Sequence, residues 1–171
     1  MRKVAVIGAT GSGKSTVSRQ LAQRLNVPHV ELDALFWKPG WEMTPAEDFR
    51  PIVAAALDTD GWVADGSYRT KLATLVLDQA DLVVWLDMPL RTKFWRIFRR
   101  TSRRIRTREV LWGTNVDTWK AALLSRDSLF WWVLKTHYPN RRDLPVLLAR
   151  YPHVHLRSQR DVEQFVESVH P

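Results

Sequence analysis

The sequence predicts an α/β fold in which helices cover both faces of a parallel sheet. Short apolar runs suited to buried strands alternate with longer segments in which apolar residues recur at helical spacing. The first apolar run leads directly into a glycine-rich loop. Alternating strands and helices imply right-handed crossovers, and ligands of such sheets bind beyond the carboxyl ends of the strands.

Five segments are expected to form the strands. Residues 3–7 are apolar and mostly β-branched, and 82–86 form a continuous apolar run typical of a strand buried on both faces. The other expected strands are 28–33, 61–66 and 153–156. Because the second ends on Asp33 and the third contains Asp65 near its end, both carboxylates are expected at the carboxyl edge of the sheet, beside the glycine-rich loop.

Helices are expected between these strands. The first follows Lys14, with Val17, Leu21 and Leu25 on one face, and ends where Asn26 precedes Pro28. The remaining helices are expected at about 45–58, 69–79, 89–105, 117–135 and 160–169. The last has the capping-box pair Ser158 and Asp161 at its start.

The segment from Gly8 to Ser15 matches the phosphate-binding P-loop pattern G-x-x-x-x-G-K-[ST] in full. Glycines let backbone N–H groups approach phosphate oxygens, and the following helix N-terminus adds partial positive charge. Lys14 is expected to reach the β- and γ-phosphates of ATP, and the Ser15 hydroxyl to bind Mg²⁺. The predicted nucleotide-binding residues here are Gly8, Gly11, Ser12, Gly13, Lys14, Ser15 and Thr16.

Composition limits the class of protein. A length of 171 residues with 45% hydrophobic content suits one domain with a sizeable core. The absence of cysteine excludes disulfides and thiolate metal sites. The chain begins almost at once with a strand, and no apolar run approaches 18 residues, so we expect a cytoplasmic protein without a signal peptide or membrane span.

The net charge of +8 is concentrated in one segment. Residues 91–108 carry nine basic side chains and no acidic one, so the rest of the chain has a net charge of −1. In a nucleotide-binding protein, such a local positive field favours a role in binding phosphate. A nucleic-acid contact through the same segment stays open as an alternative.

Further motifs resemble those of the adenylate kinase and nucleoside monophosphate kinase superfamily. They are DGSYRT at 65–70 and LDMP at 86–89, which is followed by Arg96 and Arg100. The segment 32–41, LDALFWKPGW, is similar to that of small relatives described as DNA topology modulation proteins. The resemblance covers most of the chain and implies a five-stranded sheet, a mobile lid and Mg-ATP-dependent transfer to a small acceptor.

The resemblance also implies roles for individual residues. Asp65 would hold a water of the Mg²⁺ shell, and Arg69 would bind the acceptor's phosphate. Arg96 and Arg100, on one helix face, would stabilise charge on the transferred phosphoryl group. The later lid arginine would be Arg141 or Arg142, of which we take Arg142 as the candidate. Structural alternatives are a turn acid for Asp65 and a solvated helix-start residue for Arg69.

The acceptor side of the site departs from the superfamily pattern. Ser67 and Tyr68 replace its aromatic–proline pair, so the acceptor need not be a nucleotide. Asp33 resembles the acid that orients or deprotonates an acceptor hydroxyl in shikimate kinase-like relatives, although a helix cap is an equal alternative. The Trp37 and Trp41 rings could enclose a base or sugar, with Lys38 between them meeting an anion.

These observations together predict a single P-loop kinase-like domain over 1–171, with a doubly wound five-stranded sheet of order 2-3-1-4-5. The acceptor region is expected at about 33–60 and an arginine-rich lid at about 100–142. Lys14, Arg96, Arg100 and Asp33 are the predicted catalytic residues. The alternatives are a nucleotide-regulated nucleic-acid-binding protein that uses residues 91–108, and an ATP-binding protein that has lost transferase activity. The acceptor and the oligomeric state are left open.

Overall fold

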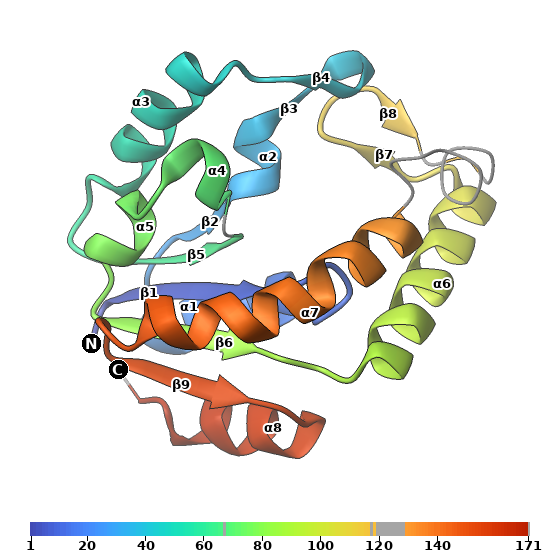
Figure 1. The fold of residues 1–171 in the computed structure, drawn as a ribbon. Coiled ribbons are helices and arrows are strands. Elements are labelled where there is room, and N and C mark those ends of the chain that lie inside the picture. The colour runs from blue at the N-terminus through green and yellow to red at the C-terminus, as the bar shows by residue number, and fades with distance from the viewer. Residues whose placement is uncertain (67, 117, 119–128, 171) are drawn as a thin grey trace.

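The computed structural model describes residues 1–66, 68–116, 118 and 129–170. Its centre is a five-stranded parallel sheet of order β2-β5-β1-β6-β9 (Figure 1). The strands are β1 (Lys3–Gly8), β2 (His29–Glu31), β5 (Trp62–Asp65), β6 (Leu82–Leu86) and β9 (His153–Leu156). Counting only these five strands along the chain, the order is 2-3-1-4-5, which confirms the predicted fold class.

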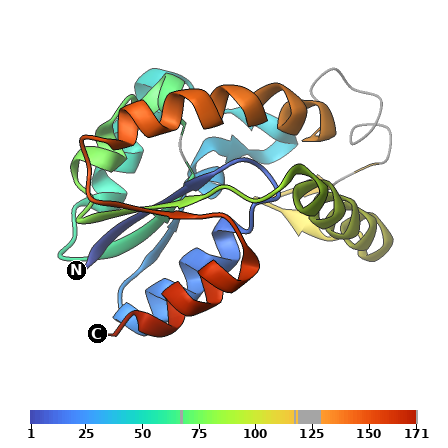
Figure 2. The same cartoon turned by 60° about the horizontal axis from the view of Figure 1, so that its bottom comes forward.

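Helices cover both faces of the sheet (Figure 2). On one face lie α1 (Lys14–Leu25) and α8 (Gln159–Ser168), whose buried Leu21 and Val166 share a core with the strands. The opposite core is formed by residues of α2 (Leu32–Phe36), α3 (Ala46–Leu57), α4 (Arg69–Leu72), α5 (Leu75–Asp78) and α7 (Leu129–Leu148). The remaining long helix, α6 (Leu90–Thr107), lies beyond the carboxyl ends of the strands. Among the residues described, no helix combines the length and apolar character needed to cross a membrane.

Two predicted helix ends are confirmed in detail. Helix α1 stops at Asn26, which adopts a left-handed conformation (φ 50°) and donates its N–H to carbonyls of the last turn. Helix α8 begins at Ser158, whose Oγ accepts the Asp161 N–H at 3.1 Å, while the Asp161 carboxylate accepts the Ser158 N–H at 2.9 Å. This reciprocal pair is the capping box expected from the sequence.

The second strand is shorter than predicted. It ends at Glu31, and Leu32–Phe36 turns into a helix, so Asp33 lies in the first turn of α2 rather than at the end of a strand. The helix lets Leu32 and Phe36, four residues apart, both enter the core, where they are 0% and 3% exposed. Burial of these two side chains outweighs continuing an edge strand that has only β5 as a neighbour.

Two helix predictions also need correction. The segment 69–79 is two short helices, because Ala73 has a φ of 51° and breaks the helical path. Residues 117 and 119–128 of the predicted helix 117–135 lie outside the described residues, and α7 (Leu129–Leu148) continues beyond the predicted end. Helix α7 continues through Pro139 and Pro145 because His137, Leu144 and Leu148 form a buried face along it.

Two small hairpins were not predicted. The first pairs β3 (Trp37–Lys38) with β4 (Glu42–Met43) around a short 3-10 turn, Pro39–Trp41. The second pairs β7 (Val110–Leu111) with β8 (Asn115–Val116). Strands of two residues are too short to show a period in the sequence.

Candidate functional site

The P-loop connects β1 to α1 and lies against α6. A Cβ atom added to Gly11 would lie 2.8 Å from the Lys93 carbonyl oxygen, and one added to Gly13 would lie 2.9 Å from an Arg96 guanidinium nitrogen. Gly11 and Gly13 have φ values of 78° and 99°, which side chains other than glycine adopt only with strain. Glycine is therefore required both by the conformation of the loop and by its close contact with α6.

Lys14 lies where several predicted site residues meet. Its Nζ donates to the Ala9 carbonyl oxygen at 3.3 Å. Burial lowers the pKa of Lys14, the carboxylates of Asp33 and Asp65 oppose that shift, and the nearby charge of Arg100 adds to it. The fold thus brings Lys14, Asp33, Asp65 and Arg100 within electrostatic reach of one another.

Arg96 contacts the P-loop directly. One of its guanidinium nitrogens donates to the Ser12 carbonyl oxygen at 2.7 Å, and another donates to Gln159 Oε1, also at 2.7 Å. Gln159 is the first residue of α8, so Arg96 joins α6, the P-loop and the start of α8. Arg96 therefore lies against the P-loop, and its role toward the phosphates stays a prediction.

Asp65 is buried at the carboxyl end of β5. Its Oδ1 lies 3.7 Å from His29 Nε2. Burial raises the pKa of Asp65, but hydrogen bonds from His29 and Ser15 and the charges of His29 and Lys14 outweigh it, so the pKa is below its ordinary value. Asp65 therefore stays ionised next to the Ser15 hydroxyl, the two groups predicted to serve Mg²⁺.

Glu31 is a site residue that the sequence analysis missed. It pairs in register with Asp65 across β2 and β5, at the same edge of the sheet. Burial, together with the charges of Asp65 and Asp33, raises the pKa of Glu31. The available signal was its place as an acidic residue at the end of the second strand, two residues before Asp33.

Asp33 is held by a residue that the sequence analysis treated only as a departure from a motif. The Tyr68 hydroxyl donates to Asp33 Oδ1 at 2.5 Å. Burial and the charge of Asp33 raise the pKa of Tyr68, so its hydroxyl stays protonated and acts as a donor. Asp33 and Tyr68 come from α2 and from the start of α4.

The other acceptor-side candidates lie on α4 and the first hairpin. Arg69 donates to Asn140 of α7 at 3.4 Å, and Lys38 is exposed on β3. The Trp37 and Trp41 rings pack edge to face, with centroids 5.6 Å apart and an interplanar angle of 80°. Their planes are therefore nearly perpendicular, which differs from the parallel arrangement expected of a sandwich around a flat ligand.

The arginines of α7 differ sharply in their surroundings. Arg142 has a side chain that is 80% exposed and pairs with its neighbour Asp143 at 2.7 Å. Arg141 instead donates its Nε to both carboxylate oxygens of the buried Asp87, each at 2.9 Å. The role of Arg142 as a lid arginine stays a prediction, since the structure places it on the solvent side of α7.

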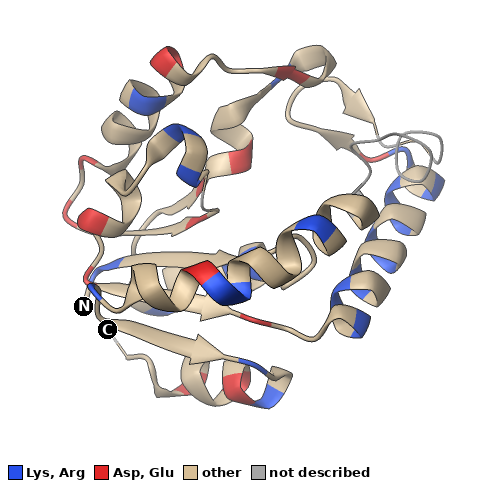
Figure 3. Ribbon diagram, viewed as in Figure 1, with Lys and Arg blue, Asp and Glu red and all other residues tan. Residues whose placement is uncertain are grey.

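The basic segment 91–108 is divided among different surroundings. Arg96 and Arg100 lie near the P-loop, whereas Arg103 and Arg104 pair with Glu109 at 3.1 and 3.5 Å. The exposed arginines of the segment are Arg91, Arg99, Arg103, Arg106 and Arg108. Figure 3 shows positive charge along the whole of α6. This division gives the kinase interpretation more support than a uniform nucleic-acid-binding face.

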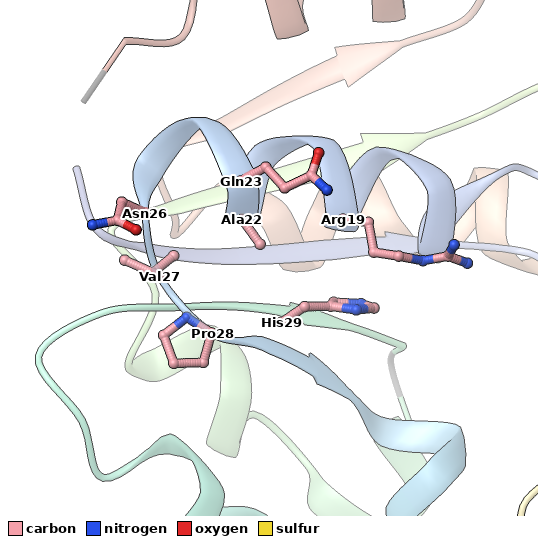
Figure 4. Close-up of a pocket in the computed structure, with 7 residues that line it drawn as sticks. All are labelled: Arg19, Ala22, Gln23, Asn26, Val27, Pro28 and His29. Carbon is pink, nitrogen blue, oxygen red and sulfur yellow. The ribbon is translucent and has the colours of Figure 1, made fainter.

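A separate open groove of about 500 Å³ lies between the C-terminal half of α1 and the start of β2 (Figure 4). Its lining includes Arg19, Asn26 and His29. The P-loop is at the opposite end of α1, where the helix dipole favours phosphate. The groove is therefore not the phosphate-binding site.

Comparisons with protein families and curated sequences point to one group. A family model described as shikimate kinase matches residues 10–51, which include Lys14 and Asp33. The shikimate kinase of Corynebacterium glutamicum is 33% identical over 113 residues, covering 58% of this chain and 66% of that protein. The shikimate kinase of Sulfurihydrogenibium sp. is 30% identical over 111 residues, covering 57% of this chain and 67% of that protein. The matched region thus spans about two thirds of these relatives.

Solved structures show the same fold. The shikimate kinase from Acinetobacter baumannii, in complex with shikimate, superposes with a TM-score of 0.60 at 17% identity, covering 98% of this chain and 89% of that one. A sugar kinase from Janibacter sp. superposes with a TM-score of 0.52 at 19% identity, covering 98% of this chain and 91% of that one. The shikimate kinase from Bacteroides thetaiotaomicron superposes with a TM-score of 0.53 at 15% identity, covering 96% of this chain and 93% of that one.

The sheet order, the P-loop and the cationic side chains around it are those of a P-loop protein with the fold of small-molecule kinases. Within that class, the sequence matches are more specific than the fold. The chain belongs to the shikimate kinase family.

Proposed function

We propose that this protein transfers the γ-phosphoryl group of Mg-ATP to a hydroxyl group of a small metabolite. The observation that supports it best is the Asp33 carboxylate, held by Tyr68 within electrostatic reach of Lys14. A monophosphate acceptor needs no base and would approach the carboxylates of Glu31, Asp33 and Asp65. Burial raises the pKa of Glu31, and the charges of Asp65 and Asp33 add to that shift. The charge distribution therefore favours a hydroxyl over a phosphate acceptor.

The residues at the P-loop fit Mg²⁺. The ion prefers oxygen ligands and keeps much of its water, and Ser15 and Asp65 offer a hydroxyl and an ionised carboxylate side by side. In our proposal Ser15 binds the ion directly, while Asp65 and Glu31 accept hydrogen bonds from its waters. When bound, Mg²⁺ neutralises charge on the β- and γ-phosphate oxygens.

In the proposed reaction the hydroxyl oxygen of the acceptor attacks the γ-phosphorus, and Asp33 accepts the proton of that hydroxyl. The new P–O bond forms while the bond from the γ-phosphorus to the bridging oxygen breaks, and ADP leaves with the bond electrons. Lys14, Arg96 and Arg100 stabilise the charge on the transferred group. Peptide N–H groups of the P-loop bind the remaining phosphate oxygens.

The acceptor itself is proposed to contact Arg69, at the start of α4, and Lys38, on the strand β3 that follows α2. A cation beside a base suits a hydroxy acid, and the named relatives are shikimate kinases, so shikimate is the first acceptor to test. We also propose, from the segment 32–41 alone, a place among the small relatives described as DNA topology modulation proteins.

The test is incubation of the protein with labelled ATP and a panel of acceptors: shikimate, other hydroxy acids, sugars, nucleosides and nucleoside monophosphates. We expect a labelled product that carries the phosphoryl group on a hydroxyl oxygen. The rate in Lys14→Ala should be lower by a factor of about 100 or more, because an essential cation is lost. Lys3→Ala, at the far end of β1, is the matched control and should retain activity. Phosphorylation of monophosphates alone would contradict a hydroxyl acceptor, and absence of ATP binding would contradict the kinase.

A further inference from the structure

We propose that Tyr68 is a positioning residue, whose hydroxyl fixes one oxygen of Asp33 so that the other faces the acceptor hydroxyl. The inference rests on the proposed function, in which Asp33 accepts the acceptor proton. It adds a residue outside the P-loop and the arginines to the parts needed for transfer.

The contact joins two elements that are distant in the sequence. Tyr68 Oη lies 2.5 Å from Asp33 Oδ1, although the residues are 35 positions apart. Asp33 is in the first turn of α2, a helix of five residues, and Tyr68 is the residue from which α4 begins. The Asp33 side chain can adopt several rotamers about its side-chain bonds, and the hydrogen bond from Tyr68 selects among them.

The Tyr68 ring has a rigid support. Its centroid lies 4.7 Å from that of Phe36 and 5.1 Å from that of Phe49, both of which are buried. Phe36 belongs to the same helix as Asp33, three residues later. One packed aromatic cluster therefore places the donor hydroxyl and the helix that carries the acceptor carboxylate, so their relative position is set by the core.

The backbone of Tyr68 indicates that the side chain is specifically needed there. Tyr68 has φ 34° and ψ 36°, a left-handed conformation that is uncommon for aromatic residues. Its carbonyl oxygen accepts the N–H groups of Lys71 and Leu72, both at 2.8 Å, and so starts α4. Glycine or asparagine would adopt this conformation at lower cost. Such local strain is typical of functional sites.

The protonation of Tyr68 suits a donor. Because burial and the Asp33 charge raise its pKa, the hydroxyl keeps its proton at physiological pH and is not itself a base. The same Asp33 charge acts on Lys14, which places the carboxylate on the side of the site where the γ-phosphate would lie. A donated hydrogen bond favours the ionised carboxylate, the form that accepts a proton.

The decisive variant is Tyr68→Phe in the full chain, because it removes the hydroxyl and keeps the ring. With an acceptor identified in the panel, kcat should fall about 10- to 100-fold, as expected for a misplaced base. The pH profile of kcat/KM should also differ from that of the wild type. KM for ATP and the thermal shift produced by Mg-ATP should stay unchanged, since Tyr68 is placed on the acceptor side.

The chain offers a matched control in a second tyrosine–aspartate pair. Tyr151 donates to Asp78 Oδ1 at 2.6 Å on the surface. Tyr151 lies just before the amino end of β9, whereas the P-loop follows the carboxyl end of the parallel strand β1. Tyr151→Phe should leave both kcat and the pH profile unchanged. A further readout needs no acceptor: the Asp33 carboxyl ¹³C resonance at a fixed neutral pH should shift in Tyr68→Phe and stay in place in Tyr151→Phe.

The outcomes separate this inference from the proposed function. A wild-type pH profile, an unmoved Asp33 resonance, or a fall in kcat explained by lower stability alone would each overturn the role of Tyr68. Full activity in Asp33→Asn would instead overturn the base role of Asp33 in the proposed function, and with it this inference. Loss of activity in Asp33→Asn together with an altered pH profile in Tyr68→Phe would support the base role of Asp33 and the positioning role of Tyr68.

Discussion

At the residue scale, a buried carboxylate ties α7 to the sheet. Asp87 follows β6 and is buried, with Arg141 Nε 2.9 Å from both of its oxygens and His155 Nε2 at 3.3 Å. The His155 ring in turn stacks on Trp85, with centroids 3.8 Å apart. A buried charge left without its partner is costly, so this pair matters more for stability than surface pairs do.

Replacing Arg141 tests that argument. We expect Arg141→Met to lower the free energy of unfolding by about 2 kcal/mol, less than for a fully buried pair because the Arg141 side chain is 44% exposed. Urea denaturation measures the change. The neighbouring Arg142→Met is the control and should unfold like the wild type, since its pair with Asp143 is on the surface. Equal effects of the two substitutions would contradict the assignment.

At the element scale, the two small hairpins are joined by the side chain of Asn115. It accepts the Trp41 N–H at 2.8 Å and donates to the Lys38 carbonyl oxygen at 3.1 Å. The Trp41 and Trp112 rings also meet edge to face, with centroids 5.9 Å apart. The hairpin on the acceptor side and the hairpin after α6 are therefore linked, and motion of one should be transmitted to the other.

The linkage predicts the effect of Asn115→Ala. Two part-buried backbone groups would lose their partner, so we expect the free energy of unfolding to fall by about 1 kcal/mol and the Trp41 amide to exchange faster with solvent. Hydrogen exchange detected by NMR measures the Trp41 exchange rate, and the slowest amides of the protein report the free energy of unfolding. Asn140→Ala, which removes one 3.4 Å contact with Arg69, should leave Trp41 exchange unchanged. Unaltered exchange in Asn115→Ala would show that the hairpins move independently.

At the scale of the whole molecule, the packing of α6 between the P-loop and α7 buries a lysine. Lys93 is 2% exposed, its Nζ lies 3.0 Å from His137 Nδ1, and its carbonyl oxygen faces Gly11. Burial, opposed by Asp87 and assisted by Arg141 and Lys14, lowers the pKa of Lys93 from 10.5 to about 8. The free energy of unfolding should therefore vary with pH in the alkaline range.

The sign of this dependence is fixed by proton linkage. Between pH 8 and 10.5 the unfolded chain holds the Lys93 proton and the folded protein has lost it, so stability rises with pH in that window. Lys93→Met removes the titration. Its stability relative to wild type should be highest below pH 8 and decline by on the order of 2 kcal/mol toward pH 10.5, after allowance for solvent screening.

Urea denaturation of wild type and Lys93→Met at several pH values between 7 and 10.5 measures this difference. Lys135→Met, at an exposed position of α7, is the control, and its difference from wild type should be flat across the range. A constant or rising difference for Lys93→Met would contradict a lowered pKa for the buried ammonium group.

The sequence by itself determined the features that depend on neighbouring residues. The P-loop, the end of α1 at Asn26, the Ser158 capping box and the five strands were all predicted, because each is encoded within a few positions. The sheet order followed from the alternation of strands and helices and the family pattern. The basic helix was also predicted, although not the separate surroundings of its arginines.

Only the tertiary structure decided which side chains meet. Arg141 and Arg142 are adjacent and point about 100° apart on a helix, so the choice between them depends on which face of α7 packs on the sheet. Glu31 meets Asp65 through strand register, and Tyr68 meets Asp33 through packing of α2 and α4 against one core. These contacts join distant segments, and burial of apolar surface across the whole domain selects them.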